Sequence, residues 1–151
     1  MISHESLATG RDVSASLYVE IQQFYGRHMR AMDECRVEVW TSDFTEDAVF
    51  ATNARPEPQI GRTVIAEGAR KAAQLLTEQG DRRRHCVGTL EVSERPDGTV
   101  VAKSYAQLVR TPQEGETVLE LFCTCEDVLI REEGRLFIKH RQVYRDDLPE
   151  N

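Results

Sequence analysis

Hydrophobic and polar positions recur with two different periods along the chain, first the period of a helix and then that of a strand. Apolar residues spaced three and four apart predict an amphipathic helix over residues 14–34. Its buried stripe is expected to contain Leu17, Ile21, Phe24, Tyr25, His28, Met29 and Met32. A second, short helix is predicted at residues 37–42, which include Trp40, and a first short strand at residues 46–52.

A third helix is predicted after a loop. The loop at residues 53–61 contains two prolines and therefore cannot continue either neighbouring element, and Thr63 is placed to cap a helix that runs to about Gln79. Gly80 follows the end of this helix, where a left-handed residue often stands. The side chains expected to face inward are Val64, Ile65, Gly68, Ala72, Leu75 and Leu76.

Four long segments with a period of two follow the helices. The predicted strands are residues 83–95, 99–111, 117–131 and 135–145, separated by turns that contain proline or glycine. Helices first and strands afterwards predict an α+β fold with an antiparallel meander. Such long strands must bend, and a curved sheet with about three helices across its concave face leaves a cone whose interior can hold a small molecule.

Strict alternation assigns the side chains of the first long strand to two faces. It places His85, Val87 and Thr89 on one face. It places Cys86, Gly88, Leu90 and Val92 on the other. Which of the two faces is concave is not decided by the alternation.

Length and charge narrow the class of protein. The 151 residues suit one domain, which we expect at residues 14–147 between flexible tails at 1–13 and 148–151. A net charge of -7 argues against nucleic acid and against an anionic membrane as partners. No apolar run is long enough to span a bilayer, and the first residues lack the apolar core of a signal peptide. We therefore expect a cytoplasmic protein.

Neither the cysteines nor the glycines form a cofactor motif. Cys35, Cys86, Cys123 and Cys125 lack paired C-x-x-C spacing, so a metal site is not expected. The chain also lacks a glycine-rich nucleotide motif and a phosphate loop. We therefore expect the protein to need no cofactor.

The segment Arg82 to Gly88 is the most informative for chemistry. It opens the first long strand with His85, and the first helix ends upstream at Asp33. An imidazole beside a carboxylate is a natural proton shuttle, because the charge of histidine changes near neutral pH. A structural interpretation stays open beside this one. His85 would then be a packing residue, and Asp33 would bind Arg36 or a backbone amide near the helix end.

Short segments along the chain carry a family resemblance that covers residues 19–147. The segments are Phe24-Tyr25-Gly26-Arg27, Met32-Asp33, Trp40, Phe44 to Phe50, Gly61-Arg62, Arg84-His85, Ser104-Tyr105, Cys125 to Arg131, Gly134 and Arg141. In this order and spacing, they resemble the SnoaL-like branch of the nuclear transport factor two-like superfamily. Within it, they are most similar to small tailoring proteins of bacterial aromatic polyketide biosynthesis.

The resemblance implies a cone-shaped, cystatin-like fold with a curved mixed or antiparallel sheet, and a homodimer. In the dehydratase branch of the family, an aspartate at the end of the first helix and a histidine at the start of the first long strand move protons. Asp33 and His85 match these two places, whereas Met32 stands where that branch has a tyrosine. The implied activity is a cyclase or a dehydratase that acts without a cofactor on a hydrophobic or aromatic ligand in an internal cavity. Candidate walls of this cavity are Tyr25, His28, Met29, Tyr105, Leu121 and Cys123.

A second function stays open. The same segments also resemble the β subunits of aromatic-ring-hydroxylating dioxygenases, which are mainly structural. In that case the chain would be a non-catalytic binding or structural subunit.

Asp127 and Arg141 are expected to pair across adjacent strands, although the run Lys139-His140-Arg141 also fits a solvated strand face.

Overall fold

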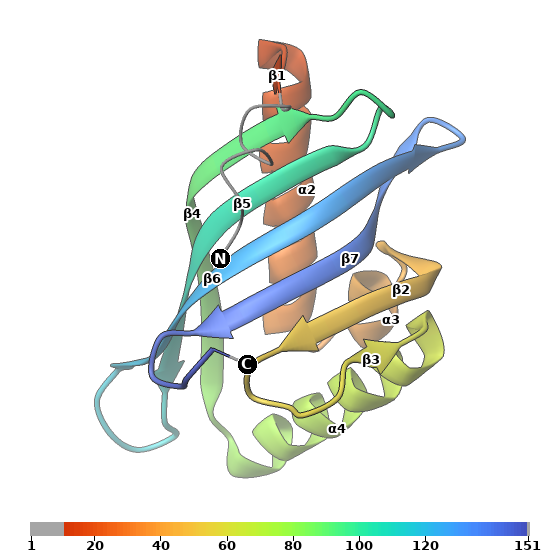
Figure 1. Ribbon diagram of the computed structural model, residues 1–151. Helices are drawn as coiled ribbons and strands as arrows, with labels where there is room; N and C mark the ends of the chain where they lie inside the picture. The colour runs from red at the N-terminus through yellow and green to blue at the C-terminus, as the bar shows by residue number, and fades with distance from the viewer. Residues whose placement is uncertain (1–10, 151) are drawn as a thin grey trace.

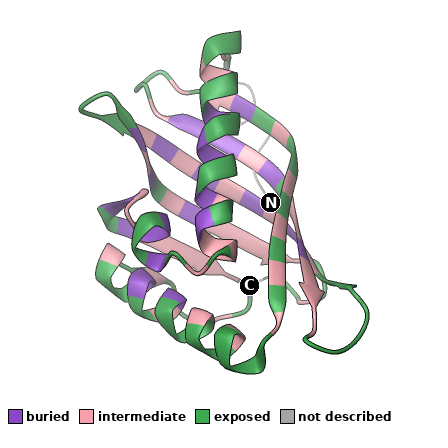
Figure 2. Ribbon diagram, turned by 180° about the vertical axis from the view of Figure 1, so that it is seen from behind, coloured by how far each residue is buried: buried purple, intermediate pink, exposed green. Residues whose placement is uncertain are grey.

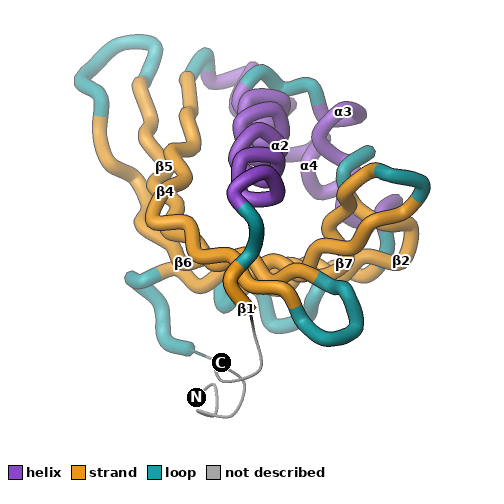
Figure 3. Tube along the Cα trace, turned by 90° about the horizontal axis from the view of Figure 1, so that it is seen from above, coloured by secondary structure: helices purple, strands orange, loops and turns teal. Residues whose placement is uncertain are grey.

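The computed structural model describes residues 11–150, which form one strongly curved sheet wrapped around a long helix (Figure 1). In chain order the elements are β1 (Arg11–Asp12), α2 (Ala15–Asp33), α3 (Val37–Thr41), β2 (Phe44–Thr52), β3 (Gln59–Ile60), α4 (Arg62–Gln79), β4 (Arg82–Glu94), β5 (Val100–Thr111), β6 (Val118–Glu132) and β7 (Arg135–Arg145). Seen from above, the sheet curves around α2, with α3 and α4 beside it (Figure 3). The expected α+β fold is therefore confirmed.

The sheet has seven strands in the order β1-β4-β5-β6-β7-β2-β3. The long strands β4 to β7 form the predicted antiparallel meander. The early strand β2 pairs in parallel with β7, so the sheet is mixed. Because β2 follows α3 directly, this pairing places the β2 side of the sheet beside α3 and α4.

Residues that were assigned to the tails take part in the fold. Arg11 and Asp12 form β1, which pairs with the end of β4. Residues 1–10, the rest of the predicted N-terminal tail, lie outside the described residues. Near the other end, the Asn53 amide donates to the carbonyls of Arg145, Leu148 and Pro149, so the last residues lie against the loop after β2.

The helix ends show one correct and one wrong prediction. α2 begins where the pattern places it, with the Ser14 hydroxyl accepting the backbone N–H of Leu17 at 3.2 Å. Thr63, however, does not cap α4. The cap residue is Gly61, whose φ of 95° lies in the positive range that glycine adopts without strain. Its N–H donates to the Ala48 carbonyl at 2.8 Å.

The buried face of α4 also differs from the prediction. Ile65, Ala66 and Ala69 are buried, whereas Val64 and Leu75 are 44% and 56% exposed. The helix packs on α3 and β2. The small alanines allow this close approach, and Figure 2 shows buried and exposed positions alternating along α4.

A β-bulge reverses the face assignment within β4. The register with β5 shifts between Gly88 and Glu91, and Thr89 takes a φ of 51°. One extra residue changes the alternation, so Leu90 and Val92 point to the same face as His85 instead of the opposite one. That face is the concave one, where Val92 joins the core.

A buried ion pair lies at the centre of the core. Asp127 on β6 and Arg141 on β7 are direct cross-strand partners, with 0% and 3% exposure. Two parallel hydrogen bonds of 2.9 Å join Nε and Nη2 of Arg141 to the two carboxylate oxygens. The expected Asp127–Arg141 pair is therefore present, and the prediction of a solvated face is wrong for Arg141.

Helix α2 completes the hydrogen bonding of this pair. The Tyr25 hydroxyl donates to Asp127 at 2.7 Å, and Arg141 Nη1 donates to Nε2 of His28 at 3.0 Å. Burial alone would raise the pKa of Asp127, but the Arg141 guanidinium outweighs it and holds that pKa below its ordinary value. The pair therefore stays ionised and connects α2 to the middle of the sheet.

We predict that Arg141→Met lowers the free energy of unfolding by about 3–5 kcal/mol, because it leaves the buried Asp127 carboxylate without its counter-ion. Urea unfolding measured by circular dichroism tests this value. The matched control is Arg131→Met, which removes an arginine from the surface pair with Glu20, where both side chains are 43% exposed. That change should cost less than about 1 kcal/mol. Equal losses in the two variants would contradict the structural role of the buried pair.

Candidate active site

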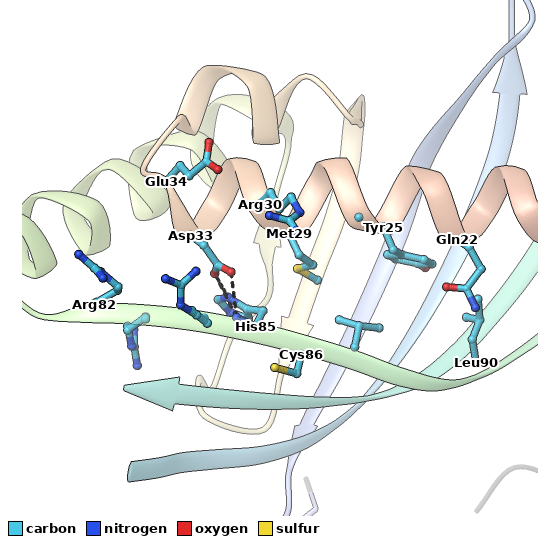
Figure 4. A pocket seen from close by; sticks show the side chains of 14 residues that line it. Gln22, Tyr25, Met29, Arg30, Asp33, Glu34, Arg82, His85, Cys86 and Leu90 are labelled. Carbon is cyan, nitrogen blue, oxygen red and sulfur yellow. Dashed lines mark hydrogen bonds and ion pairs between the residues drawn. The ribbon is translucent and has the colours of Figure 1, made fainter. Parts of the chain in front are cut away.

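The ends of two elements bring Asp33 and His85 together. Asp33 is the last residue of α2, and His85 lies near the start of β4, which passes alongside the end of the helix (Figure 4). Asp33 Oδ1 lies 2.6 Å from His85 Nδ1, and Oδ2 accepts the backbone N–H of His85 at 3.0 Å. The carboxylate thus holds both the backbone and the ring of the same histidine. We call this pair the Asp33–His85 dyad.

The hydrogen bonds of the dyad determine which ring nitrogen is free. An ionised carboxylate only accepts hydrogen bonds, so a neutral imidazole places its proton on Nδ1 and keeps a lone pair on Nε2. Within residues 11–150, the hydrogen bonds of the His85 side chain all go to Asp33. Nε2 is therefore available to take a proton from a bound molecule.

His85 lies on the wall between two spaces. A groove of about 590 Å³ runs along α2 and β4 (Figure 4). A cavity of about 400 Å³ lies between the sheet and the helices α2 and α4. Tyr25, Met29, Arg83, His85 and Val87 line both spaces. The imidazole is 26% exposed, so it is accessible without being fully solvated.

Four of the six expected wall residues line the cavity. They are Tyr25, Met29, Leu121 and Cys123. Tyr25 presents its ring there while its hydroxyl donates to Asp127. Burial and then the Asp127 charge raise the pKa of this hydroxyl well above its ordinary value, so Tyr25 stays protonated.

The other two expected wall residues lie elsewhere. Tyr105 is 48% exposed on the outer face of the sheet, because β5 alternates and its neighbours Ser104 and Ala106 take the inner face. There its ring lies 6.0 Å from that of Phe122. His28 is fully buried and lines neither the cavity nor the groove.

His28 is a packing residue with both ring nitrogens bonded. An arginine can only donate, so Nε2 accepts from Arg141 and Nδ1 carries the proton that it donates to Asp43 at 2.8 Å. The ring lies between those of Phe24 and Trp40 at 5.6 and 5.4 Å. Burial, followed by the Arg141 charge, lowers the pKa of His28 to about 4.

The cavity also contains charged residues that the sequence patterns do not indicate. Arg55, Arg141 and Arg145 line it together with the Gln59 and Gln107 amides. The pairing of Arg141 with Asp127 is the one signal that could have placed an arginine inside. Nothing in the loop sequence around Arg55 marks that side chain as inward.

The described residues provide no other obvious chemistry. Across residues 11–150, no three His, Cys, Asp or Glu side chains cluster as metal ligands would. In the same part of the chain, none of the helices combines the length and the apolar character needed to cross a membrane. The four cysteines are all free thiols.

Comparison with known proteins identifies the family. The SnoaL-like domain family matches residues 13–142. The chain belongs to this family. Among curated proteins, none matches the chain.

Solved structures agree with this assignment. Aln2 from a Streptomyces species is 34% identical to this SnoaL-like domain, with a TM-score of 0.83 over 91% of this chain and 96% of Aln2. A Catenulispora acidiphila protein in complex with S-DNPA is also 34% identical, with a TM-score of 0.77 over 89% of this chain and 96% of that one. An NTF2-like protein with a cystatin-like fold from Novosphingobium aromaticivorans has a TM-score of 0.74 at 20% identity, over 97% of this chain and 92% of that one. The last comparison supports the fold alone.

We predict that His28 makes the stability of this domain depend on pH between about 4 and 6.5. Its folded pKa of about 4 lies below the ordinary 6.5, so the unfolded chain binds more protons in this window. The free energy of unfolding should therefore be constant above about pH 6.5 and fall by a few kcal/mol as the pH drops toward 4. Urea unfolding at several pH values measures the slope.

The variant His28→Gln isolates this effect, because an amide can still accept from Arg141 and donate to Asp43 but cannot titrate. Its slope between pH 4 and 6.5 should be clearly smaller than that of the wild type. His140→Gln, which removes a histidine from the outer face of β7, serves as the control and should keep the slope. A slope that is the same in all three proteins would refute the role of His28.

Proposed function

We propose that this SnoaL-like domain is a cofactor-independent cyclase or dehydratase that acts by acid/base catalysis on an aromatic polyketide-like intermediate. The observation that carries the proposal is the 2.6 Å contact between Asp33 and His85, which leaves the Nε2 lone pair of His85 free at the wall of the cavity. The family supports a tailoring function of this general type. The bound S-DNPA in the Catenulispora acidiphila relative supports a small-molecule ligand.

In a dehydration, His85 Nε2 would remove the proton from the carbon next to a carbonyl group. The electron pair of that C–H bond forms an enolate, which expels the hydroxyl group on the following carbon and leaves a C=C bond. The imidazolium returns its proton to the departing oxygen, so water leaves and His85 is neutral again. Asp33 keeps Nδ1 protonated and stabilises the transient positive charge.

In a ring closure, the same groups would act on two oxygen atoms. His85 takes the proton of a hydroxyl group, the oxygen attacks a carbonyl carbon, and the imidazolium gives its proton to the carbonyl oxygen. Positioned proton transfer contributes about 10²- to 10⁴-fold in rate. A reaction that is already favourable, such as either of these, needs no further chemical group.

The cavity supports this function over that of a purely structural subunit. Most of its lining residues are apolar, and the polar groups among them include the Gln59, Ser104 and Gln107 side chains, His85 and four arginines. A concave apolar space with few convergent polar groups is the usual form of a small-molecule site. A subunit that only packs against a larger chain has no need of such a space beside a hydrogen-bonded histidine.

The test is the metabolite profile of a host that makes the pathway product but lacks this chain. The host is complemented with wild type, His85→Gln or Asp33→Asn, and the soluble amount of each variant is measured. We expect an uncyclised or hydrated intermediate to accumulate in both variants, because each loses about 10²-fold or more in rate. His140→Gln and Asp97→Asn change the same residue types on the outer face and in a hairpin, and should restore the product. Full restoration by both dyad variants would refute the catalytic role and favour the structural subunit.

A further inference from the structure

The arginines that line the cavity differ in whether a carboxylate neutralises them. Three are paired at 2.7–2.9 Å: Arg145 with Asp147, Arg83 with Glu120, and Arg141 with Asp127. The fourth is Arg55, on the loop after β2. Among residues 11–150, Arg55 has no carboxylate partner, and its Nε and Nη2 atoms are buried without a hydrogen-bond partner. The cavity therefore carries one uncompensated positive charge.

The two unpartnered atoms form one edge of the guanidinium group. Nε–H and Nη2–H point in nearly the same direction and match the two oxygens of a carboxylate. This chain uses that edge elsewhere. Arg141 binds Asp127 through Nε and Nη2 at 2.9 Å, and Arg145 binds Asp147 through the same two atoms at 3.0 and 2.7 Å. Arg55 presents the same donor pair, for which residues 11–150 provide no acceptor.

Burying guanidinium donors without acceptors destabilises the protein when no ligand is bound. Burial lowers the pKa of Arg55, which reflects the loss of water around its charge. The Phe50 ring, 5.1 Å from the guanidinium carbon, compensates only in part. Folded proteins leave few buried donors unpaired, and those that persist often serve a function.

We propose that Arg55 anchors a carboxylate group of the ligand through Nε and Nη2, so that this domain acts on an aromatic or polycyclic carboxylic acid. The inference rests on the proposed function and adds the substrate class. A single unpaired charge with a planar fork favours a monoanionic carboxylate over a phosphate. The apolar side chains of Met29, Leu108 and Leu121 surround the remaining space, where rings would lie between Arg55 and His85.

Binding of a matched pair of probes to the full chain tests the proposal. The probes are 2-naphthylacetate and the neutral 2-naphthylacetamide, with isothermal titration calorimetry as the measurement. We expect wild type to bind the carboxylate about tenfold or more tightly than the amide. Arg55→Gln should remove that preference, and Arg55→Lys should keep part of it, because a lysine supplies the charge without the fork.

Arg145→Gln is the matched control. It removes an arginine from the same cavity, but one that Asp147 already neutralises, so the preference for the carboxylate should persist. Circular dichroism establishes that each variant is folded. Equal affinity of wild type for the two probes, no binding of either, or an unchanged preference in Arg55→Gln would overturn the proposal.

Probe binding and product formation in the complemented host, measured on the same variants, separate this inference from the proposed function. His85→Gln should lose product formation and still prefer the carboxylate, because Arg55 is intact. If the dyad variants restore the product but Arg55→Gln loses the preference, the anchor stands and the acid/base role fails. If the dyad variants lose the product and the probe preference does not depend on Arg55, the catalytic role stands and the anchor fails.

Discussion

The ion pair between Asp127 and Arg141 is the interaction on which the rest of this fold depends. It joins two neighbouring strands in the middle of the curved sheet, and it contacts helix α2 through Tyr25 and His28. Because a buried charge is tolerated only when it is fully hydrogen-bonded, the helix can dock in few positions and orientations. Asp43 continues the chain of contacts from His28 to Arg135 at the surface, so β2 and β7 are held in the same arrangement.

The position of the candidate site follows from that docking. With Tyr25 and His28 fixed in the middle of the sheet, the last turn of α2 places Asp33 against the start of β4. Both dyad residues therefore belong to rigid elements, and neither depends on a mobile loop for its geometry. The bulge after Gly88 turns the rest of β4 so that Leu90 and Val92 also lie on the concave face, where Leu90 lines the groove and Val92 joins the core. The cavity beside the dyad also contains the Arg55 guanidinium, which has no carboxylate partner among residues 11–150.

The predictable parts of the structure are those with strong local signals. Turn residues and long alternation mark the four long strands, and the predicted strand at residues 135–145 matches β7 at both ends. The Asp33–His85 contact was also foreseeable, because the family resemblance names both places. The stripe on α4 was misread because Ala66 and Ala69 are weak hydrophobic signals beside Val64 and Leu75. The partners that make His28 a packing residue lie 15 and 113 positions away, so no local pattern distinguishes it from His85. No sequence pattern predicts the burial of Arg55, since that burial depends on strands and a helix from other parts of the chain.

The measurement that tests the central claim most directly is the tautomer of His85, read by ¹⁵N-resolved NMR of the histidine side chains above the pH range in which imidazoles titrate. The His85 signals are assigned by their loss in His85→Gln. We predict a proton on Nδ1, shifted downfield by its short hydrogen bond to Asp33, and a bare Nε2 nitrogen. In Asp33→Asn, that downfield proton should disappear. A proton on Nε2 in the wild type would contradict the claim, because the ring nitrogen that is not bound to Asp33 would then have no lone pair with which to act as a base.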